Sequence, residues 1–174
     1  MLKNNLVELR ALEITDLETI YHWENNTKLW KVGDTLTPYA KYQIEKFIEL
    51  STEDIYTTKQ LRLMIDYKDS QSIKTVGCID LFDLDVKNEK AALGIMIEKA
   101  YRNRKIATNA LSLFIEYCFK HLHLHQVYCH IPASNQASIK LFSQVGFEKN
   151  GELKDWIKTS NKYEKVFVFQ LVNE

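Results

Sequence analysis

Apolar and polar residues recur with two different periods along this chain, and the changes of period predict its elements. Residues 6–12 alternate closely enough to predict a first strand. The next segment has the pattern of a capping box, in which the Thr15 hydroxyl and the Glu18 carboxylate satisfy free amides at the start of a helix. A second helix is predicted from Pro38 to about Leu50, because proline is tolerated at the first helical position.

The middle of the chain changes to the period of strands. Three β-branched, apolar segments separated by polar turns predict an antiparallel meander. A helix is expected at about residues 107–121, and Asn135 can cap another that runs through Gln144. The seven strands are expected at residues 6–12, 61–67, 75–82, 91–98, 126–131, 152–158 and 163–171.

This order of elements predicts a mixed α/β (α+β) fold, with antiparallel strands first and a strand–helix–strand–helix unit later. About seven strands and about four helices are expected. The length of 174 residues favours one compact domain, and no linker or repeat interrupts the chain. We therefore expect residues 1–174 to form a single domain.

Charge and cysteine content exclude several classes of protein. Lysine plus arginine equals aspartate plus glutamate at 23 each, so no overall field draws the chain to nucleic acid or to an anionic membrane. No signal peptide or membrane-spanning run is present, which predicts a cytoplasmic protein. Cys78, Cys118 and Cys129 lack metal-ligand spacing and are expected to be buried thiols in a reducing compartment.

A short basic loop joins one predicted strand directly to the long predicted helix. Arg102, Arg104 and Lys105 stand just before the helix begins. Free amides at a helix N-terminus and the helix dipole favour a bound anion, and the usual anion is a phosphate. The alternative is a solvated basic turn. A nucleic-acid patch is disfavoured, because aromatic residues are not interleaved with these basic ones.

This segment resembles the coenzyme A-binding motif of the GNAT superfamily of N-acetyltransferases, Gln/Arg-x-x-Gly-x-Gly/Ala between a strand and a helix. Arg102 fills the first position and Ala107 the last, but Lys105 stands where the family has glycine. A lysine can serve there if its backbone stays right-handed, or its ammonium can reach a phosphate. The resemblance implies that acetyl-CoA is bound by Ile95, Met96, Ile97, Arg102, Asn103, Arg104, Lys105, Ile106, Ala107 and Thr108.

A second segment resembles the late motif of the same superfamily. The matching residues are Asn135, Ser138, Phe142, Gly146 and Phe147. The resemblance implies that Asn135 bonds the pantetheine arm and that Lys140 lies near the phosphates. A plain helix cap is the alternative for Asn135. Residues 9–17 and 150–153 resemble the family too, and the overall pattern is most similar to the branch of ribosomal-protein alanine and polyamine acetyltransferases.

The resemblance implies a GNAT fold, with a central, mostly antiparallel, twisted sheet. It also implies acetyl transfer from acetyl-CoA to a primary amine, of a polyamine-like small molecule or a protein N-terminus, by direct attack in a ternary complex. Many relatives carry a tyrosine proton donor where this chain has Phe142, so another group or solvent must protonate the leaving sulfur. Lys105 and Phe142 together suggest the alternative, a non-catalytic acyl-CoA-binding or sensor module.

Candidate catalytic residues lie on two predicted strands. Period two places Tyr128 and His130 on the face opposite the apolar residues of strand 126–131. The resemblance places His130 where several relatives carry a glutamate base, and an imidazole suits proton transfer near neutral pH. An exposed strand histidine is the alternative. Asp80 is the acidic rival for the role of base, and Tyr128 is the third catalytic candidate.

The segment that contains residues 30–39 is expected to bind the acceptor. Trp30, Asp34 and Tyr39 come from the segment that forms the acceptor wall in the family, where aromatic rings can hold an amine by cation–π contact. Few acids lie nearby, which argues against a dedicated spermidine enzyme. The histidines at 121, 123 and 125 are more typical of a surface turn than of a metal site. We expect an amine or peptide N-terminus as partner, no metal, no nucleic acid and no membrane, and leave a homodimer open.

Overall fold

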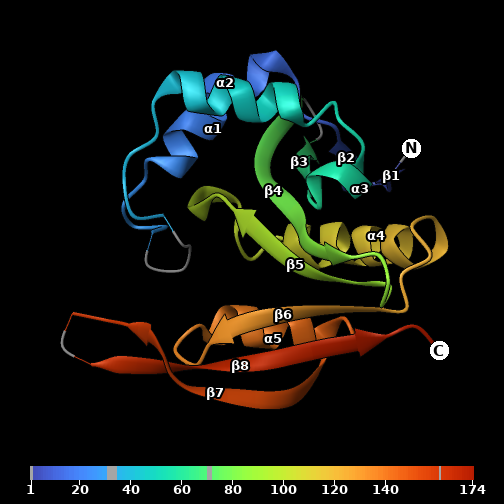
Figure 1. The fold of residues 1–174 in the computed structure, drawn as a ribbon. Helices are drawn as coiled ribbons and strands as arrows, with labels where there is room; N and C mark the ends of the chain where they lie inside the picture. The colour runs from blue at the N-terminus through green and yellow to red at the C-terminus, as the bar shows by residue number, and fades with distance from the viewer. Residues whose placement is uncertain (1, 31–34, 70–71, 161) are drawn as a thin grey trace.

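The computed structural model describes residues 2–30, 35–69, 72–160 and 162–174 (Figure 1). The strands in these ranges are β1 (Leu2–Lys3), β2 (Val7–Arg10), β3 (Leu61–Asp69), β4 (Ser72–Asp85), β5 (Lys90–Ile97), β6 (Gln126–Pro132), β7 (Glu148–Lys158) and β8 (Tyr163–Val172). The α-helices are α1 (Leu17–Glu24), α2 (Lys41–Leu50), α3 (Ile55–Thr58), α4 (Ile106–Lys120) and α5 (Gln136–Gln144). Short 3₁₀ turns η1 (Ile14–Asp16) and η2 (Lys99–Tyr101) precede α1 and α4.

The strands join in one sheet in the order β1-β2-β3-β4-β5-β6-β8-β7. Neighbours are antiparallel except β5 and β6, which are parallel, so the predicted mixed fold with a mostly antiparallel sheet is confirmed. The described residues form eight strands and five α-helices, one more of each than expected. β1 has two residues and α3 has four, and elements that short leave no period in a sequence.

Helices cover both faces of the sheet and divide the core into two clusters. On one face, α4 buries Phe114 and Leu111 against strand residues such as Ile65. On the other face, Ile20 of α1 and Ile44 of α2 pack with Met64. Adjacent Met64 and Ile65 belong to different clusters because successive side chains of a strand point to opposite faces. The sheet therefore has an α4 face and an α1/α2 face, and both faces support the candidate site.

The predicted capping box at Thr15 is wrong. Glu13 is the N-cap of η1 instead, and Asp16, at the third position of that turn, accepts a hydrogen bond from the Glu13 amide on Oδ2 at 2.9 Å. Arg10 donates to both Asp16 carboxylate oxygens, at 2.7 and 2.8 Å. Glu18 is exposed and pairs with Lys41. The buried Asp16 carboxylate needs strong partners, and Arg10 with the Glu13 amide supplies them better than a hydroxyl can.

α2 begins at Lys41, three residues after the predicted start at Pro38. Gln43 accepts a hydrogen bond from the Ala40 amide at 2.8 Å and so serves the helix start. Tyr39, which precedes Ala40, is held by the side chain of Asn25. This side chain accepts a hydrogen bond from the Tyr39 amide at 2.8 Å and donates one to the Tyr39 carbonyl at 3.1 Å. Because these bonds tie Tyr39 to the end of α1, the chain enters the helix only after it.

β5 and β6 pair over a short length and then separate. The parallel ladder joins Lys90–Ala92 to Gln126–Tyr128, but β5 continues to Ile97 and β6 to Pro132. Figure 1 shows the two strands together at the β5 start and apart at its end, where the chain turns toward α4. The sheet is therefore wedged open between its two halves at the end of β5.

The cysteines are free and buried, as predicted. Burial raises the pKa of each thiol, Cys78, Cys118 and Cys129, to about 12. These groups are therefore protonated and unreactive at neutral pH. In the described part of the chain, no helix is both long and apolar enough to cross a membrane.

Candidate functional site

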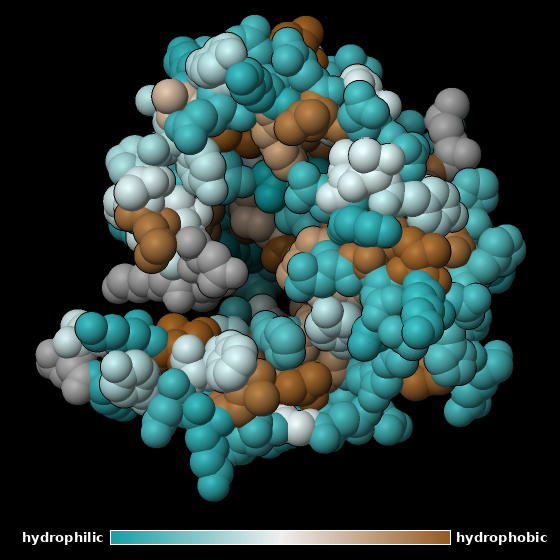
Figure 2. Space-filling view, in the orientation of Figure 1, coloured by the Kyte–Doolittle hydropathy of each residue, from teal (hydrophilic) through white to brown (hydrophobic). Residues whose placement is uncertain are grey.

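The wedge between β5 and β6 opens into a hollow on the molecular surface. Figure 2 shows it between the part that carries α1 and α2 and the part that carries β6, β7 and β8. Two parts of the structure border this hollow. One is the loop that follows β5, at the end where β5 and β6 are apart, and the other is the α1/α2 face of the sheet. Most of the residues singled out by the sequence lie on these two parts.

The loop before α4 carries backbone amides that are free to bind an anion. Within the described residues, the amides of residues 103–108 donate to no acceptor, whereas the Asn109 amide already bonds the Lys105 carbonyl at 3.1 Å. Unpaired amides in the first turn of a helix are expected, and they point along the positive end of the helix dipole. This part of the chain therefore supports phosphate binding at residues 103–108.

Lys105 does not keep the right-handed backbone that was expected of a lysine at the family's glycine position. Its φ and ψ are 61° and 7°, in the left-handed region, and it is the N-cap residue of α4. Asn103 is left-handed too, at φ 63°. The tight turn into α4 demands this geometry whatever side chain is present, so Lys105 adopts the conformation that a glycine would adopt.

The three cations of the loop have different surroundings. Arg102 donates from Nε to the Ile97 carbonyl at 3.0 Å, which ties the loop to the end of β5. The Arg104 guanidinium lies over the Tyr101 ring, 5.4 Å from its centroid. Lys105 is exposed. Arg102 thus has a structural contact that the sequence did not indicate, while its remaining nitrogens add positive charge.

The end of β5, residues 95–97, forms one side of the wedge. β4 pairs with it on the other side, with Gly77 opposite Ile97 and Cys78 opposite Met96. The two strands approach closely, because a Cβ on Gly77 would lie 2.1 Å from the Met96 carbonyl oxygen. The β4 edge of β5 is therefore occupied, and the opposite edge from Leu93 to Ile97 has no ladder partner among the described strands. An unpaired strand edge fits the amide-bearing pantetheine arm of coenzyme A.

The late motif lies across the wedge on α5. Asn135 caps the helix, and its Oδ1 accepts from the Ser138 amide at 3.2 Å, so the plain-cap interpretation describes one of its functions. Its side-chain nitrogen has no partner within the described ranges and is free to donate. Lys140 is exposed on the same helix. Phe142 is 4% exposed and packs edge to face on Phe147, with ring centroids 5.0 Å apart.

Tyr128 and His130 lie on the predicted face of β6. Val127, Cys129 and Ile131 are buried, whereas His130 is exposed, as the alternation predicted. The Tyr128 and His130 rings meet edge to face at 5.7 Å. Tyr128 pairs with Ala92 in the parallel ladder, which places it on the α1/α2 face of the sheet. Burial, together with the charges of Asp83 and Asp85, raises the pKa of Tyr128, so its phenol stays protonated at neutral pH.

A shallow depression surrounds these two rings. It is lined by Lys90, Gln126, Tyr128, His130, Val168 and Gln170. Gln170 donates to Gln126 and accepts from Asn150 at 2.7 Å, so a row of side-chain amides crosses β6, β8 and β7. His130 is thus exposed on a mostly polar, solvent-open surface.

Asp80 lies on the same face but is held in an ion pair. Arg62 donates to Asp80 Oδ1 at 2.6 Å and to Oδ2 at 3.2 Å, and it also donates to Glu24 Oε1 at 2.6 Å. Burial lowers the pKa of Arg62, but the charges of Asp80 and Glu24 outweigh burial and hold it well above its usual value. The sequence did not single out Arg62. A charged residue inside the apolar run of residues 61–65 was the available signal.

The acceptor-wall residues are partly described. Trp30 is half-buried and donates from Nε1 to the Glu24 carbonyl at 2.6 Å, and Tyr39 packs against the α1/α2 core. Asp34 lies outside the described residues. Trp23 packs in that core and also donates to the Glu98 carboxylate at 2.8 Å, close to the basic loop.

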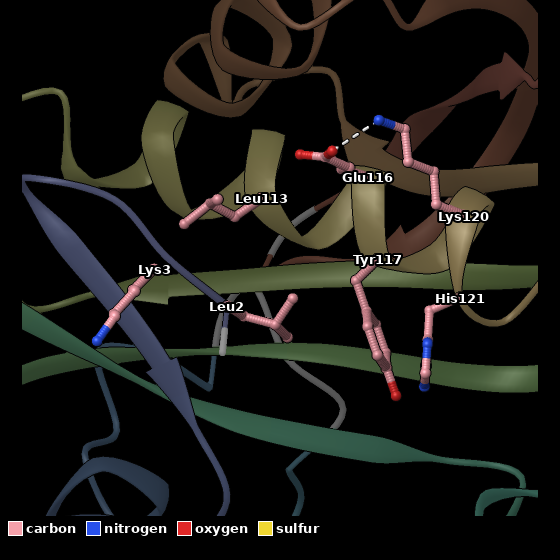
Figure 3. A pocket seen from close by; sticks show the side chains of 7 residues that line it. All are labelled: Leu2, Lys3, Leu113, Glu116, Tyr117, Lys120 and His121. Carbon is pink, nitrogen blue, oxygen red and sulfur yellow. Dashed lines mark hydrogen bonds and ion pairs between the residues drawn. The ribbon is translucent and has the colours of Figure 1, made fainter.

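Another surface depression lies away from this wedge, between β1 and the C-terminal half of α4. Figure 3 shows Tyr117 and His121 side by side and the Glu116–Lys120 ion pair at 2.8 Å. None of the residues that the sequence singled out for binding or catalysis lines it. The described residues also contain no group of three or more His, Cys, Asp or Glu side chains that could hold a metal ion.

Comparison with known proteins gives a family match and similar enzymes. Residues 7–148 match the model of the acetyltransferase (GNAT) domain. A spermidine N(1)-acetyltransferase of Vibrio cholerae is 24% identical over 94% of this chain and 91% of its own length. One from Escherichia coli K12 is 25% identical over 84% of this chain and 75% of its own length.

A solved structure shows the same fold. The spermidine N-acetyltransferase of Vibrio cholerae, in complex with CoA and spermine, superposes with a TM-score of 0.80. The superposition covers 97% of this chain and 96% of that one, at 24% sequence identity. The predicted central sheet with flanking helices is therefore the architecture of this group of enzymes.

Proposed function

Because the chain belongs to the acetyltransferase (GNAT) domain family, we propose that it acetylates the primary amine of a small, polyamine-like molecule or of a protein N-terminus. Membership makes it an acetyl-CoA-dependent N-acetyltransferase. The choice of acceptor is the proposal, and it draws on relatives named as spermidine N(1)-acetyltransferases. We further propose that residues 1–174 act as one catalytic domain.

The observation that carries the proposal is the row of free amides at residues 103–108, beside the wedge between β5 and β6. The loop offers donors and positive charge to the phosphates of acetyl-CoA, and the unpaired edge of β5 offers peptide groups to its pantetheine arm. The cofactor-binding residues we assign are Ile95, Met96, Ile97, Arg102, Asn103, Arg104, Lys105, Ile106, Ala107, Thr108, Asn135 and Lys140.

In the proposed mechanism, both substrates are bound together and the amine nitrogen attacks the acetyl carbonyl directly. Acetyl-CoA supplies the acetyl group as a thioester. The new C–N bond forms as the C–S bond breaks, and backbone amides at the end of β5 stabilise the negative charge that develops on the carbonyl oxygen. The amine must also lose a proton.

We assign the proton-accepting role to His130. It is exposed on the α1/α2 face, whereas both oxygens of its rival, Asp80, are bonded by Arg62. A carboxylate held in that way must first leave an ion pair before it can accept a proton. Tyr128, protonated and in ring contact with His130, is assigned as the group that supports proton transfer to the departing sulfur. Trp30, Asp34 and Tyr39 are assigned to the acceptor wall.

The experiment is acetyl-CoA turnover with a panel of amines, followed by release of free thiol. Polyamines, simple monoamines, amino acids, aminoglycosides and peptides with free N-termini form the panel. The buried cysteines, with pKa values of about 12, give little background with thiol reagents. Turnover with any amine supports the proposal.

Binding without turnover would contradict it. If acetyl-CoA raises the melting temperature but no amine is acetylated, the chain is an acyl-CoA-binding or sensor module, the alternative that Lys105 and Phe142 suggested. Self-association is also part of the proposal, because a spermidine N-acetyltransferase of Vibrio cholerae has a dodecameric structure. Light scattering after size exclusion would show a dimer or larger assembly, and a monomer would contradict this part alone.

A further inference from the structure

Two carboxylates on the α1/α2 face of the sheet, where we place the amine acceptor, share a single guanidinium. Arg62 of β3 bonds Asp80 of β4 at 2.6 Å and Glu24, the last residue of α1, also at 2.6 Å. The three side chains are 19%, 25% and 26% exposed, respectively, so the cluster reaches solvent. Two negative charges and one positive charge leave it with a net single negative charge.

The cluster lies beside the place where the amine must approach. Asp80 pairs with Gly94 of β5, and a Cβ on Gly94 would lie 4.0 Å from the Asp80 Cβ, so both positions share one face. Ala92, two residues earlier, pairs with Tyr128, which places Tyr128 and His130 of β6 on that face too. With strands spaced about 4.8 Å apart, β4 and β6 are separated by roughly 10 Å where β5 pairs with both, and they lie farther apart beyond Tyr128, where the wedge opens.

This arrangement has a consequence for the charge of the acceptor. A carboxylate attracts an ammonium group only while its own charge is unbalanced, and a bidentate guanidinium balances it with strong hydrogen bonds. Asp80 has both oxygens bonded by Arg62. Glu24 uses Oε1, and no described residue donates to its Oε2. The cluster can therefore balance one further positive charge and no more.

We propose that Arg62 is a specificity-determining residue that acts as a built-in counter-cation. The acceptor is then an amine whose only positive charge is the ammonium group that becomes acetylated, such as a monoamine or a peptide N-terminus followed by uncharged residues. This inference rests on the proposed acetyl transfer to an amine, and it replaces the polyamine-like acceptor by an amine with a single positive charge. The positive charge of Arg62 already balances one of the two carboxylate charges that could otherwise attract a second ammonium of a di- or polyamine.

The test compares n-butylamine with 1,4-diaminobutane, two acceptors of equal carbon length that differ in one ammonium group. The wild-type protein should acetylate butylamine with a kcat/KM, counted per amino group, equal to or above that for diaminobutane. Arg62→Met keeps an apolar side chain against the Phe47 ring, removes the guanidinium whose central carbon lies 5.1 Å from the ring centroid, and leaves both carboxylates unbalanced. This variant should shift the preference toward diaminobutane roughly tenfold, through KM and not kcat.

Arg62→Lys is the matched control, because it keeps the positive charge and should keep the wild-type preference. A merely structural role for Arg62 would lower turnover of both amines together and leave their ratio unchanged, which would overturn the inference. A wild-type kcat/KM for diaminobutane that exceeds the value for butylamine, counted per amino group, would overturn it too.

Glu24→Gln keeps the test decisive if Arg62→Met does not fold. This change makes the cluster neutral, so kcat/KM for protonated butylamine should fall roughly tenfold. Acetylation of an arylamine, which is neutral at pH 7, should be unaffected, and an equal loss with both acceptors would overturn the inference. If no amine at all is acetylated, the proposed function fails. The charge preference is then measured by ligand binding instead of turnover. Diaminobutane should raise the melting temperature of Arg62→Met more than butylamine does.

Discussion

Asn103 and Lys105 both hold a left-handed backbone, at φ 63° and 61°, on the two sides of Arg104. Residues of alternating hand turn successive amides toward a common centre, which forms a concave site for anions. Such a backbone is costly for residues that carry a Cβ. Lys105 therefore holds a left-handed backbone that glycine would adopt without strain, and it adds a charge that glycine lacks.

Lys105→Gly should be tolerated and should stabilise the fold. Relief of the left-handed conformation gains about 1–2 kcal/mol, and the greater freedom of glycine in the unfolded chain costs about 0.5–1 kcal/mol. The net gain of up to about 1.5 kcal/mol should raise the melting temperature by up to about 3–6 °C. Calorimetry without ligand measures this change.

The charge of Lys105 should be visible in coenzyme A affinity. Lys105→Glu replaces attraction by repulsion and should weaken binding roughly tenfold, with a smaller effect at high salt. Lys105→Ala is the control, because it removes the charge but keeps the Cβ and its strain. Isothermal titration that gave equal affinities for the Ala and Glu variants would show that this side chain does not face the phosphates.

The sequence predicted the elements that have a strong period and missed those that depend on contacts between distant residues. The meander, α4 and the alternation on β6 were correct, because burial on one face imposes a period. The cap at Thr15 was wrong because Arg10, a residue of the preceding strand, supplies the partner of Asp16. No local pattern could indicate that contact.

The candidate site was predictable to the same extent. Motif spacing placed Asn135 at a helix start and the basic loop before α4, both as the structure has them. The left-handed backbone of Lys105 was not predictable, since the turn before α4 sets it. The ion pairs of Arg62 were not predictable either, since they join residues of three different elements. The roles of the site residues stay predictions that the following experiments address.

His130→Gln should lower turnover roughly 10²–10⁴-fold, the usual contribution of a positioned base. Glutamine keeps a polar side chain of similar size but cannot titrate. Wild-type activity should rise with pH through the neutral range, as an imidazole loses its proton, and the variant should lack this rise. Steady-state rates across pH measure both effects, and acetyl-CoA affinity should scarcely change.

Asp80→Asn is the comparison for the assignment of the base. Because Arg62 already bonds both Asp80 oxygens, this change should affect stability and acceptor KM more than the pH profile. A loss of the pH-dependent rise in Asp80→Asn, with His130→Gln near normal, would transfer the role to Asp80. Normal turnover in both variants would mean that the amine arrives already neutral from solution.

Phe142→Tyr tests whether the family's proton donor can be restored. Phe142 is 4% exposed and its ring packs edge to face on Phe147 at 88°. A hydroxyl added to a buried ring without a partner costs about 1–3 kcal/mol. We expect a lower melting temperature and no gain in kcat. A faster variant would instead show that the ring edge faces the thioester, and that Tyr128 is not the donor.

Asp16→Asn should be strongly destabilising, because it removes one partner of a buried ion pair. Asp16 is 5% exposed and forms an ion pair with Arg10 at 2.7 Å. Arg10 also forms an ion pair with Asp66, at 2.9 Å. The loss should be about 3 kcal/mol, or about 6–12 °C in melting temperature. Glu18→Gln removes one partner of an exposed pair and should change stability by less than about 1 kcal/mol.

The same pair predicts how stability depends on pH. Burial raises the pKa of Asp16, but the hydrogen bonds and charge of Arg10, with the bond from the Glu13 backbone, outweigh burial and hold it below its ordinary 3.8. A carboxyl whose pKa is lowered on folding stabilises the fold fully above its unfolded pKa, and this stability is lost as pH falls through the folded value. Urea unfolding should therefore show the wild type losing its advantage over Asp16→Asn below about pH 4. An advantage that stays constant down to pH 2 would contradict the lowered pKa, because the ion pair cannot survive protonation of its carboxylate.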